Sequence, residues 1–150
     1  MSTVHVLIGI PGVGKSTWIR NNIASDIPVI CPDRFLEEKY NYEWTPSRAA
    51  EAWADAYRQF AECLQANCSM VWDATFLRSI ERSAVLHISK GFGYRTIAVV
   101  VQAPLEVCLE RNRKRERRPV PDEKIVAMAE WLSPPDQDEG FDEIIVFDSQ

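Results

Sequence analysis

The sequence predicts an α/β protein in which five parallel strands form one sheet with helices on both faces. Three observations support this prediction. Short β-type runs alternate with helical periodicity along the chain, which is typical of parallel sheets with right-handed crossovers. The strongest run, residues 96–101, is apolar on both faces, as a central parallel strand should be. A glycine-rich turn also joins the first strand to the first helix, at the sheet edge where such proteins bind ligands.

That turn has the pattern of a phosphate-binding loop. Gly9, Gly14, Lys15 and Ser16 fit G-x-x-x-x-G-K-[ST], with a strand-like run before the pattern and a helical one after it. Gly12 and Gly14 lack a Cβ, so the backbone can adopt positive φ angles and direct its N–H groups at an anion. The helix that follows adds the positive end of its dipole to the same attraction.

The pattern also predicts ligands for the loop's polar residues. Lys15 is expected to reach the β- and γ-phosphates of a nucleoside triphosphate, ATP, and the hydroxyl of Ser16 is expected to bind Mg²⁺. A glycine-rich turn that binds nothing would explain neither residue. The expected ATP-binding residues of the loop are Gly12, Val13, Gly14, Lys15, Ser16 and Thr17.

The first half of the chain is expected to continue with a strand at 27–31, a weak helix at 34–40 and a long helix. Thr45 and Pro46 suit the start of the long helix, as a hydroxyl N-cap and a proline at the first helical position. This helix should end near Asn67 and pack on a sheet face, with its aromatic residues in the core. Its apolar stripe consists of Ala49, Trp53, Ala56, Tyr57, Phe60 and Leu64.

The second half alternates in the same way. A strand at 68–72 precedes a helix at 79–90, for which Gly91 is the expected C-cap, and the strand at 96–101 follows. Pro104 opens a helix that runs into a cationic segment, which prolines end. The final elements are a helix marked by Ile125, Met128, Ala129 and Leu132 and a strand at 143–147.

Composition narrows the function classes. A net charge of −5 argues against a protein that coats nucleic acid, whereas six cations in residues 111–118 suit a small anion or one nucleic acid end. We expect one domain over residues 1–150, with no membrane span and no signal peptide. The cysteines, expected to be reduced in a cytoplasmic protein without a structural metal, are Cys31, Cys63, Cys68 and Cys108.

Two aspartates follow strands at the ligand edge of the predicted sheet. Asp33 is placed to accept a proton from an attacking hydroxyl, or else to cap the helix that follows it. Asp73 is placed to orient the water shell of Mg²⁺ or a substrate group, with an Asx turn as the alternative. Thr75 would add a second polar group facing the same cleft.

The arginine run and two aromatic residues each allow two interpretations. Arg111 and Arg115 lie one helical turn apart, and an arginine-rich lid would supply positive charge during phosphoryl transfer. The alternative is a solvated helix end whose cations suit the helix dipole. Trp44 and Phe76, in predicted loops near the cleft, either stack on a base or pack against the protein.

Several pieces of the sequence match one known family. These are GIPGVGKSTW from Gly9, PDRF from Pro32, DATF from Asp73 with Arg82, and ERNRKR from Glu110, followed by Val120 and Pro121. On these pieces the chain resembles the P-loop kinases that include phage polynucleotide 5′-hydroxyl kinases and the kinase modules of RNA repair enzymes. The resemblance implies an adenylate-kinase-like P-loop NTPase fold with an arginine-rich lid at about 112–121. It also implies transfer of the γ-phosphate of ATP to the 5′-OH end of RNA or DNA.

The resemblance carries over to individual residues. Asp33 matches the general base, and Arg115 matches the lid arginine on the phosphates, with Arg111 as its supporting partner. The implied catalytic residues are Asp33, Lys15, Arg115 and Arg111, with Arg115 also binding ATP. The implied substrate-binding residues are Asp33, Arg34, Asp73, Thr75 and Arg82, and the implied metal ligands are Ser16 and Asp73.

One residue departs from the family pattern. The family has an arginine three residues after the base, used on the phosphate of the acceptor, where this chain has Leu36. Arg34 is the nearest substitute, although on a helix its side chain should point elsewhere. The departure favours an alternative acceptor, a small molecule such as a nucleoside, a sugar or an antibiotic. A further alternative is an ATP-binding regulatory module that acts through a protein partner.

Overall fold

The computed structural model describes residues 1–116 and 119–149. Its five strands are β1 (Thr3–Ile8), β2 (Val29–Ile30), β3 (Met70–Trp72), β4 (Arg95–Gln102) and β5 (Glu143–Asp148). They form one sheet in the order β2-β3-β1-β4-β5, and every neighbouring pair is parallel. The predicted five-stranded parallel sheet is therefore confirmed. No helix within the described ranges is long and apolar enough to cross a lipid bilayer.

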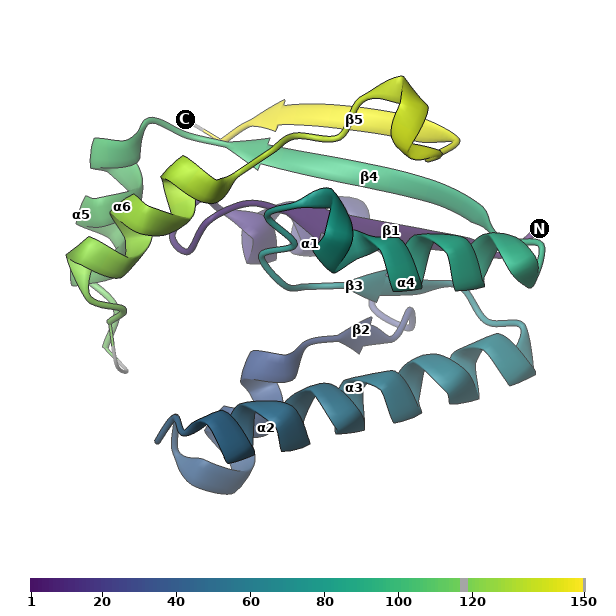
Figure 1. Cartoon of the computed structure of the whole chain (residues 1–150), viewed down its shortest axis with the longest axis horizontal. Coiled ribbons are helices and arrows are strands. Elements are labelled where there is room, and N and C mark those ends of the chain that lie inside the picture. The colour runs from purple at the N-terminus through teal and green to yellow at the C-terminus, as the bar shows by residue number, and fades with distance from the viewer. Residues whose placement is uncertain (117–118, 150) are drawn as a thin grey trace.

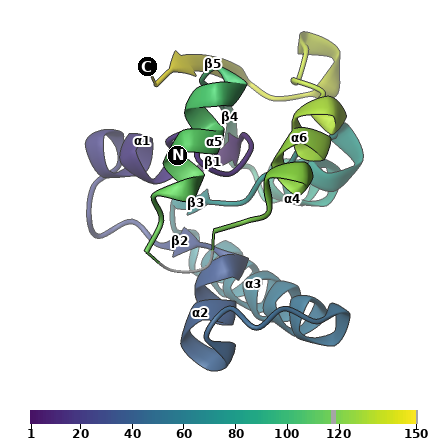
Figure 2. The ribbon, with the colours of Figure 1, turned by 90° about the vertical axis from the view of Figure 1, so that its left-hand side faces the viewer.

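Helices cover both faces of this sheet (Figures 1 and 2). They are α1 (Lys15–Asn22), α2 (Pro32–Tyr40), α3 (Pro46–Ala66), α4 (Ser79–Gly91), α5 (Leu105–Arg113) and α6 (Asp122–Trp131), and a short 3₁₀ turn covers Gln137–Glu139. β1 shows how the two faces are built, because its side chains alternate between them. Val6 and Ile8 pack in the core under α3 and α4, whereas Leu7 packs in the core under α1 and α5.

The parallel arrangement places one set of loops together. The carboxyl ends of the strands lie at the left of Figure 1, where α2, α5, α6 and the start of α3 also lie. The loops that follow β1, β2 and β3 therefore meet at one edge of the sheet, which is where parallel sheets bind ligands.

The boundaries of α3 agree with the sequence signals. The Thr45 hydroxyl accepts a hydrogen bond from the Arg48 N–H at 3.1 Å, and Pro46 is the first helical residue. Asn67 ends the helix in the left-handed conformation, with φ of 55°, and its N–H donates to the carbonyls of the last turn. The predicted N-cap and the predicted end of this helix are therefore confirmed.

Some local predictions are wrong. Trp53 and Tyr57 were expected in the core, but each is 36% exposed, and the rings of both contact the buried Trp72 ring. Gly91 does not cap α4 but lies in its last turn, with Phe92 at the cap position and Gly93 at φ of 81°. The strands predicted at 27–31 and 68–72 are reduced to two and three paired residues.

Helix α4 supports a stability prediction. Replacing the fully buried Leu86 by Ala leaves a cavity between α4 and the sheet, which should lower the free energy of unfolding by about 2–5 kcal/mol. Ile80 on the same helix is 77% exposed, so Ile80→Ala should change it by less than about 0.5 kcal/mol. Urea unfolding of both variants measures the difference, and equal effects would contradict the packing described here.

Candidate active site

The turn after β1 has the geometry of an anion-binding loop. Gly12 and Gly14 adopt φ of 83° and 108°, a region open to glycine, so the turn can wrap around the start of α1. The half-buried Lys15 folds back over the loop, and its Nζ donates to the carbonyl oxygen of Gly9 at 2.7 Å. The Gly9 N–H donates to the Thr75 carbonyl at 3.0 Å, which ties the loop to the segment after β3.

Arg111 holds this loop from its outer side. Its Nη1 donates to the carbonyl oxygens of Gly12 and Val13 at 3.3 and 3.2 Å. The same guanidinium donates to the hydroxyl and carbonyl oxygens of Ser149 at 3.0 and 3.1 Å, and the Ser149 hydroxyl donates to Val13. Arg111 also lines the cavity over the loop, and it directly precedes the predicted lid of 112–121. Its contacts brace the loop backbone, and its catalytic role stays a prediction.

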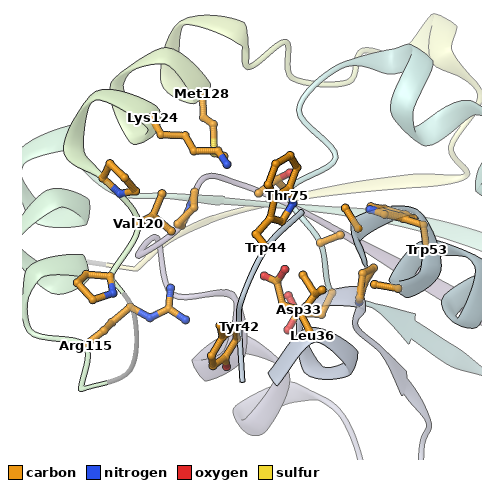
Figure 3. A pocket seen from close by; sticks show the side chains of 18 residues that line it. Asp33, Leu36, Tyr42, Trp44, Trp53, Thr75, Arg115, Val120, Lys124 and Met128 are labelled. Carbon is orange, nitrogen blue, oxygen red and sulfur yellow. The ribbon is translucent and has the colours of Figure 1, made fainter. Parts of the chain in front are cut away.

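Two cavities adjoin the loop. The first, here called the loop cavity, has a volume of about 460 Å³ and is lined by residues 11–17 and by Arg34 and Arg111. The second, here called the aromatic cavity, has a volume of about 400 Å³ and is lined by Leu36, Trp44 and Trp53 (Figure 3). The two cavities share Pro11, Asp33, Tyr42, Asp73, Ala74, Thr75, Arg115 and Val120.

Asp33 lies in this shared wall. It is exposed in the first turn of α2, whose N-cap is Cys31 and which has no side-chain capping hydrogen bond. The structure therefore gives no support to a capping role for Asp33. Its carboxylate is left facing the two cavities, next to Asp73 and Thr75 from the segment after β3.

Burial changes the charge balance beneath the shared wall. It lowers the pKa of the Lys15 ammonium, and the negative charges of Asp73 and Asp33 act against this decrease. Burial also raises the pKa of the Asp73 carboxyl, an increase that Lys15 opposes and Asp33 reinforces. The charged forms of Lys15 and Asp73 are therefore less stable in this site than they would be in water.

Arg115 lies where a lid residue is expected, but the helix does not reach it. Helix α5 ends at Arg113, and Arg115 lies just beyond it, exposed and lining both cavities. The buried Asn112 closes the base of this segment, because its side-chain amide pairs with both the N–H and the carbonyl of Val120. Residues 117–118, within the predicted lid of 112–121, lie outside the described residues.

Two predicted substrate-binding arginines do not line the aromatic cavity. Arg34 lines the loop cavity and not the aromatic cavity, because the next position on α2 is turned about 100° from Asp33. Arg82 is 1% exposed and lines neither cavity, which corrects the expectation that it binds substrate. Its guanidinium pairs with Glu139 at 2.7 Å and donates to the carbonyls of Phe76 and Ser133.

Arg82 supports the site from a distance. It donates at 2.7 Å to Phe76, a buried residue with an unfavourable φ of 45° for a side chain of its size. Phe76 follows Thr75, whose carbonyl accepts from Gly9 in the loop. The buried ion pair therefore fixes the segment after β3 that forms the shared wall. Of the two aromatics left open by the sequence, Phe76 is in the core and Trp44 lines the aromatic cavity.

Sequence reasoning did not identify several lining residues. Tyr42 lies in both walls at φ of 63°, and its hydroxyl donates to Glu37 at 2.9 Å. Lys124 and Met128 reach the aromatic cavity from α6, four residues apart on one helix face. Their spacing of four residues was the only sequence feature that indicated a shared position at the cavity. The same spacing also fits a helix that packs on the core.

The Arg82–Glu139 pair can be tested by unfolding. Removing one partner leaves an uncompensated buried charge, so Arg82→Met and Glu139→Gln should each lower the free energy of unfolding by about 3–5 kcal/mol. The double variant should lose less than the sum of the two. Arg58→Met removes two surface ion pairs, with Asp55 and Glu62, and serves as the control, with an expected loss under about 1 kcal/mol. Additive losses in urea unfolding would contradict the coupling.

Cys31 at the loop cavity allows a pH prediction. Burial raises the pKa of this thiol to about 11, and the charge of Asp73 adds to the increase. Only the thiolate reacts, so alkylation by iodoacetamide at about pH 8 should be slow and should rise about tenfold per pH unit. Mass spectrometry can follow the reaction, with the exposed Cys68 as internal control. Cys31 labelling as fast as Cys68 at that pH would show that it is not shielded.

Solved structures of other proteins share this fold. A candidate kinase from Chloroflexus aurantiacus matches with a TM-score of 0.78 at 19% identity, over 99% of this chain and 89% of that one. A chain of the Pnkp1/Rnl/Hen1 RNA repair complex matches with a TM-score of 0.77 at 20% identity, over 87% of this chain and 44% of that one. A gluconokinase from Sinorhizobium meliloti 1021 matches with a TM-score of 0.63 at 19% identity, over 99% and 83%. These likenesses establish a P-loop kinase-like fold.

The family is established by the sequence itself. A family model described as AAA domain, AAA_33, matches residues 4–135. This span runs from β1 to the loop after α6 and includes every residue that lines the loop cavity and the aromatic cavity. The chain therefore belongs to the AAA_33 family of AAA domains.

Proposed function

We propose that this protein is a phosphotransferase that moves the γ-phosphate of ATP to a hydroxyl group, and that the acceptor is the 5′-OH end of RNA or DNA. One observation carries the proposal. The loop cavity and the aromatic cavity adjoin at a wall that contains Asp33, Asp73 and Arg115. Phosphates bound at the loop and a hydroxyl group in the aromatic cavity would meet at this wall, the proximity that phosphoryl transfer needs.

The residues of the two cavities suit distinct roles in such a transfer. Lys15 and the loop N–H groups bind the β- and γ-phosphates. Asp33 accepts the proton of the acceptor hydroxyl as its oxygen bonds to the γ-phosphorus. The bond from the γ-phosphorus to its bridging oxygen breaks at the same time, and ADP leaves. Arg115, which lines both cavities, stabilises the charge on the transferring group.

The side chains at the loop also fit Mg²⁺. Ser16 and Asp73 both line the loop cavity and offer oxygen atoms, the ligands that this ion prefers. In the described part of the chain, no three histidine, cysteine or acidic residues are arranged so that they could hold a metal ion together. That agrees with an ion held by few protein ligands, together with water and phosphate. When bound, Mg²⁺ would neutralise charge on the phosphates, and Ser16 and Asp73 would hold it there.

A small-molecule acceptor is the second candidate. Leu36 lines the aromatic cavity at the position where the resembling family has an arginine that binds the phosphate of the acceptor. An uncharged side chain there and a net charge of −5 both favour a small-molecule acceptor over nucleic acid. The cavity, at about 400 Å³, is also within the size range of small-molecule sites. The likeness to a gluconokinase fits this candidate, as the likeness to a chain of an RNA repair complex fits the first.

A transfer assay separates the candidates. Labelled γ-phosphate from ATP with Mg²⁺ is offered to 5′-OH RNA, 5′-OH DNA, free nucleosides and sugars, with Lys15→Ala as the control. Label on oligonucleotides that disappears in the control supports the first candidate. Label on nucleosides or sugars alone supports the second. ATP binding without any transfer, together with ATP-dependent capture of a protein partner, would instead support an ATP-binding regulatory module.

Asp33 gives the sharpest test of the mechanism. Asp33→Asn keeps the shape of the side chain but removes the proton acceptor, so kcat should fall by about 10²–10⁴-fold. ATP affinity should change little, because the loop and Lys15 are intact. Steady-state kinetics and nucleotide titration measure the two quantities. Near-normal kcat in this variant would exclude Asp33 as the base.

A further inference from the structure

Among the described residues, one cation lines the aromatic cavity without also lining the loop cavity. The described basic residues of the aromatic cavity are Arg115 and Lys124, and Arg115 also lines the loop cavity. Lys124 lines the aromatic cavity alone and reaches it from the first turns of α6, opposite Asp33 and Leu36 on α2 (Figure 3). The shared wall thus holds Asp33 and Asp73 together with Arg115, and Lys124 adds a positive charge on the α6 side of the cavity.

The charge on Lys124 is not compensated within the described ranges. The other four lysines each bond to an oxygen atom there: Lys15 to Gly9, Lys39 to Glu51, Lys90 to Gly140 and Lys114 to Glu110. The Lys124 ammonium has no carboxylate within 4.0 Å among the described residues. Its recorded neighbour is the Trp44 ring, with Nζ 5.3 Å from the centroid. A cation in this position is available to an anionic ligand.

Trp44 provides an aromatic surface beside that cation. It is 56% exposed and lies in the loop between α2 and α3. Trp53 lines the same cavity, although its ring stacks on Trp72 with centroids 5.9 Å apart. An exposed indole beside an uncompensated ammonium suits a ligand that joins a flat ring to an anion, because rings stack and phosphates pair with cations.

We infer that Lys124 binds a phosphate on the acceptor and that Trp44 stacks on the acceptor's base, so the aromatic cavity recognises a nucleotide with a phosphate on its 3′ side. The inference rests on the proposed function, since it places the 5′-hydroxyl of that nucleotide at Asp33. It moves phosphate recognition from α2, where Leu36 offers no charge, to α6 across the cavity. Two acceptors share this chemistry, a nucleoside 3′-monophosphate and the 5′-OH end of an oligonucleotide.

The test compares three acceptors with wild-type protein and Lys124→Ala. The acceptors are a nucleoside, its 3′-monophosphate and a short 5′-OH oligonucleotide of the same base. Loss of a charged contact should raise KM for the two phosphorylated acceptors by about tenfold, with kcat and the KM for ATP nearly unchanged. The nucleoside should show no such change. Lys124→Arg should keep most of the wild-type KM, because it retains the positive charge.

A second set of variants separates recognition from general effects. Lys90→Ala removes a cation at the end of α4, away from both cavities, and should leave all three KM values unchanged. Trp44→Ala should raise KM for all three acceptors, and Trp44→Phe should restore much of the loss. If the oligonucleotide but not the 3′-monophosphate depends on Lys124, the ligand is a phosphate further along the strand, and the inference as stated is overturned.

The remaining outcomes distinguish the inference from the proposed function. If wild-type protein phosphorylates nucleic acid acceptors but Lys124→Ala changes all three KM values equally or not at all, the inference fails and the proposed function stands. If wild-type protein transfers phosphate to none of the three acceptors, both fail. A selective loss in Lys124→Ala, rescued in Lys124→Arg, supports both.

Discussion

All five strands run in one direction, and the rest of the structure depends on that constraint. A parallel strand cannot be reached by a short turn, so each connection crosses a face of the sheet and carries at least one helix. The loops after β1, β2 and β3 consequently meet at one edge, and they carry the phosphate-binding loop, Asp33 and Asp73. The site is assembled by topology from segments far apart in the sequence.

The interactions that hold this edge together are mostly long-range, which explains what the sequence could and could not predict. The glycine-rich loop, the Thr45 cap and the interior strand β4 were predicted because their causes lie within a few residues. Arg111 donates to the Gly12 carbonyl, 99 residues away, and Arg82 pairs with the Glu139 carboxylate, 57 residues away, so no local pattern revealed these contacts.

Electrostatics adds a second feature to the site. Burial disfavours the charged forms of both Lys15 and Asp73, and the attraction between their opposite charges acts against this effect. Groups that serve ligand binding often have such incomplete compensation, because the ligand supplies the missing partner. Phosphates would stabilise the ammonium of Lys15, and a divalent cation would stabilise the carboxylate of Asp73. A bound triphosphate with its divalent cation would therefore stabilise the two charges that burial disfavours.

The contact between Ser149 and the phosphate-binding loop links that loop to an edge of the sheet. Ser149 directly follows β5, which pairs with β4 on one side only, and edge strands are the first part of a sheet to open. Each opening of β5 would release Ser149, and with it one support of the loop. The opening of β5 and the binding of a nucleotide at the loop are then coupled equilibria. A bound nucleotide would therefore slow the exchange of backbone amide protons in β5, although it binds at the loop and not at that strand.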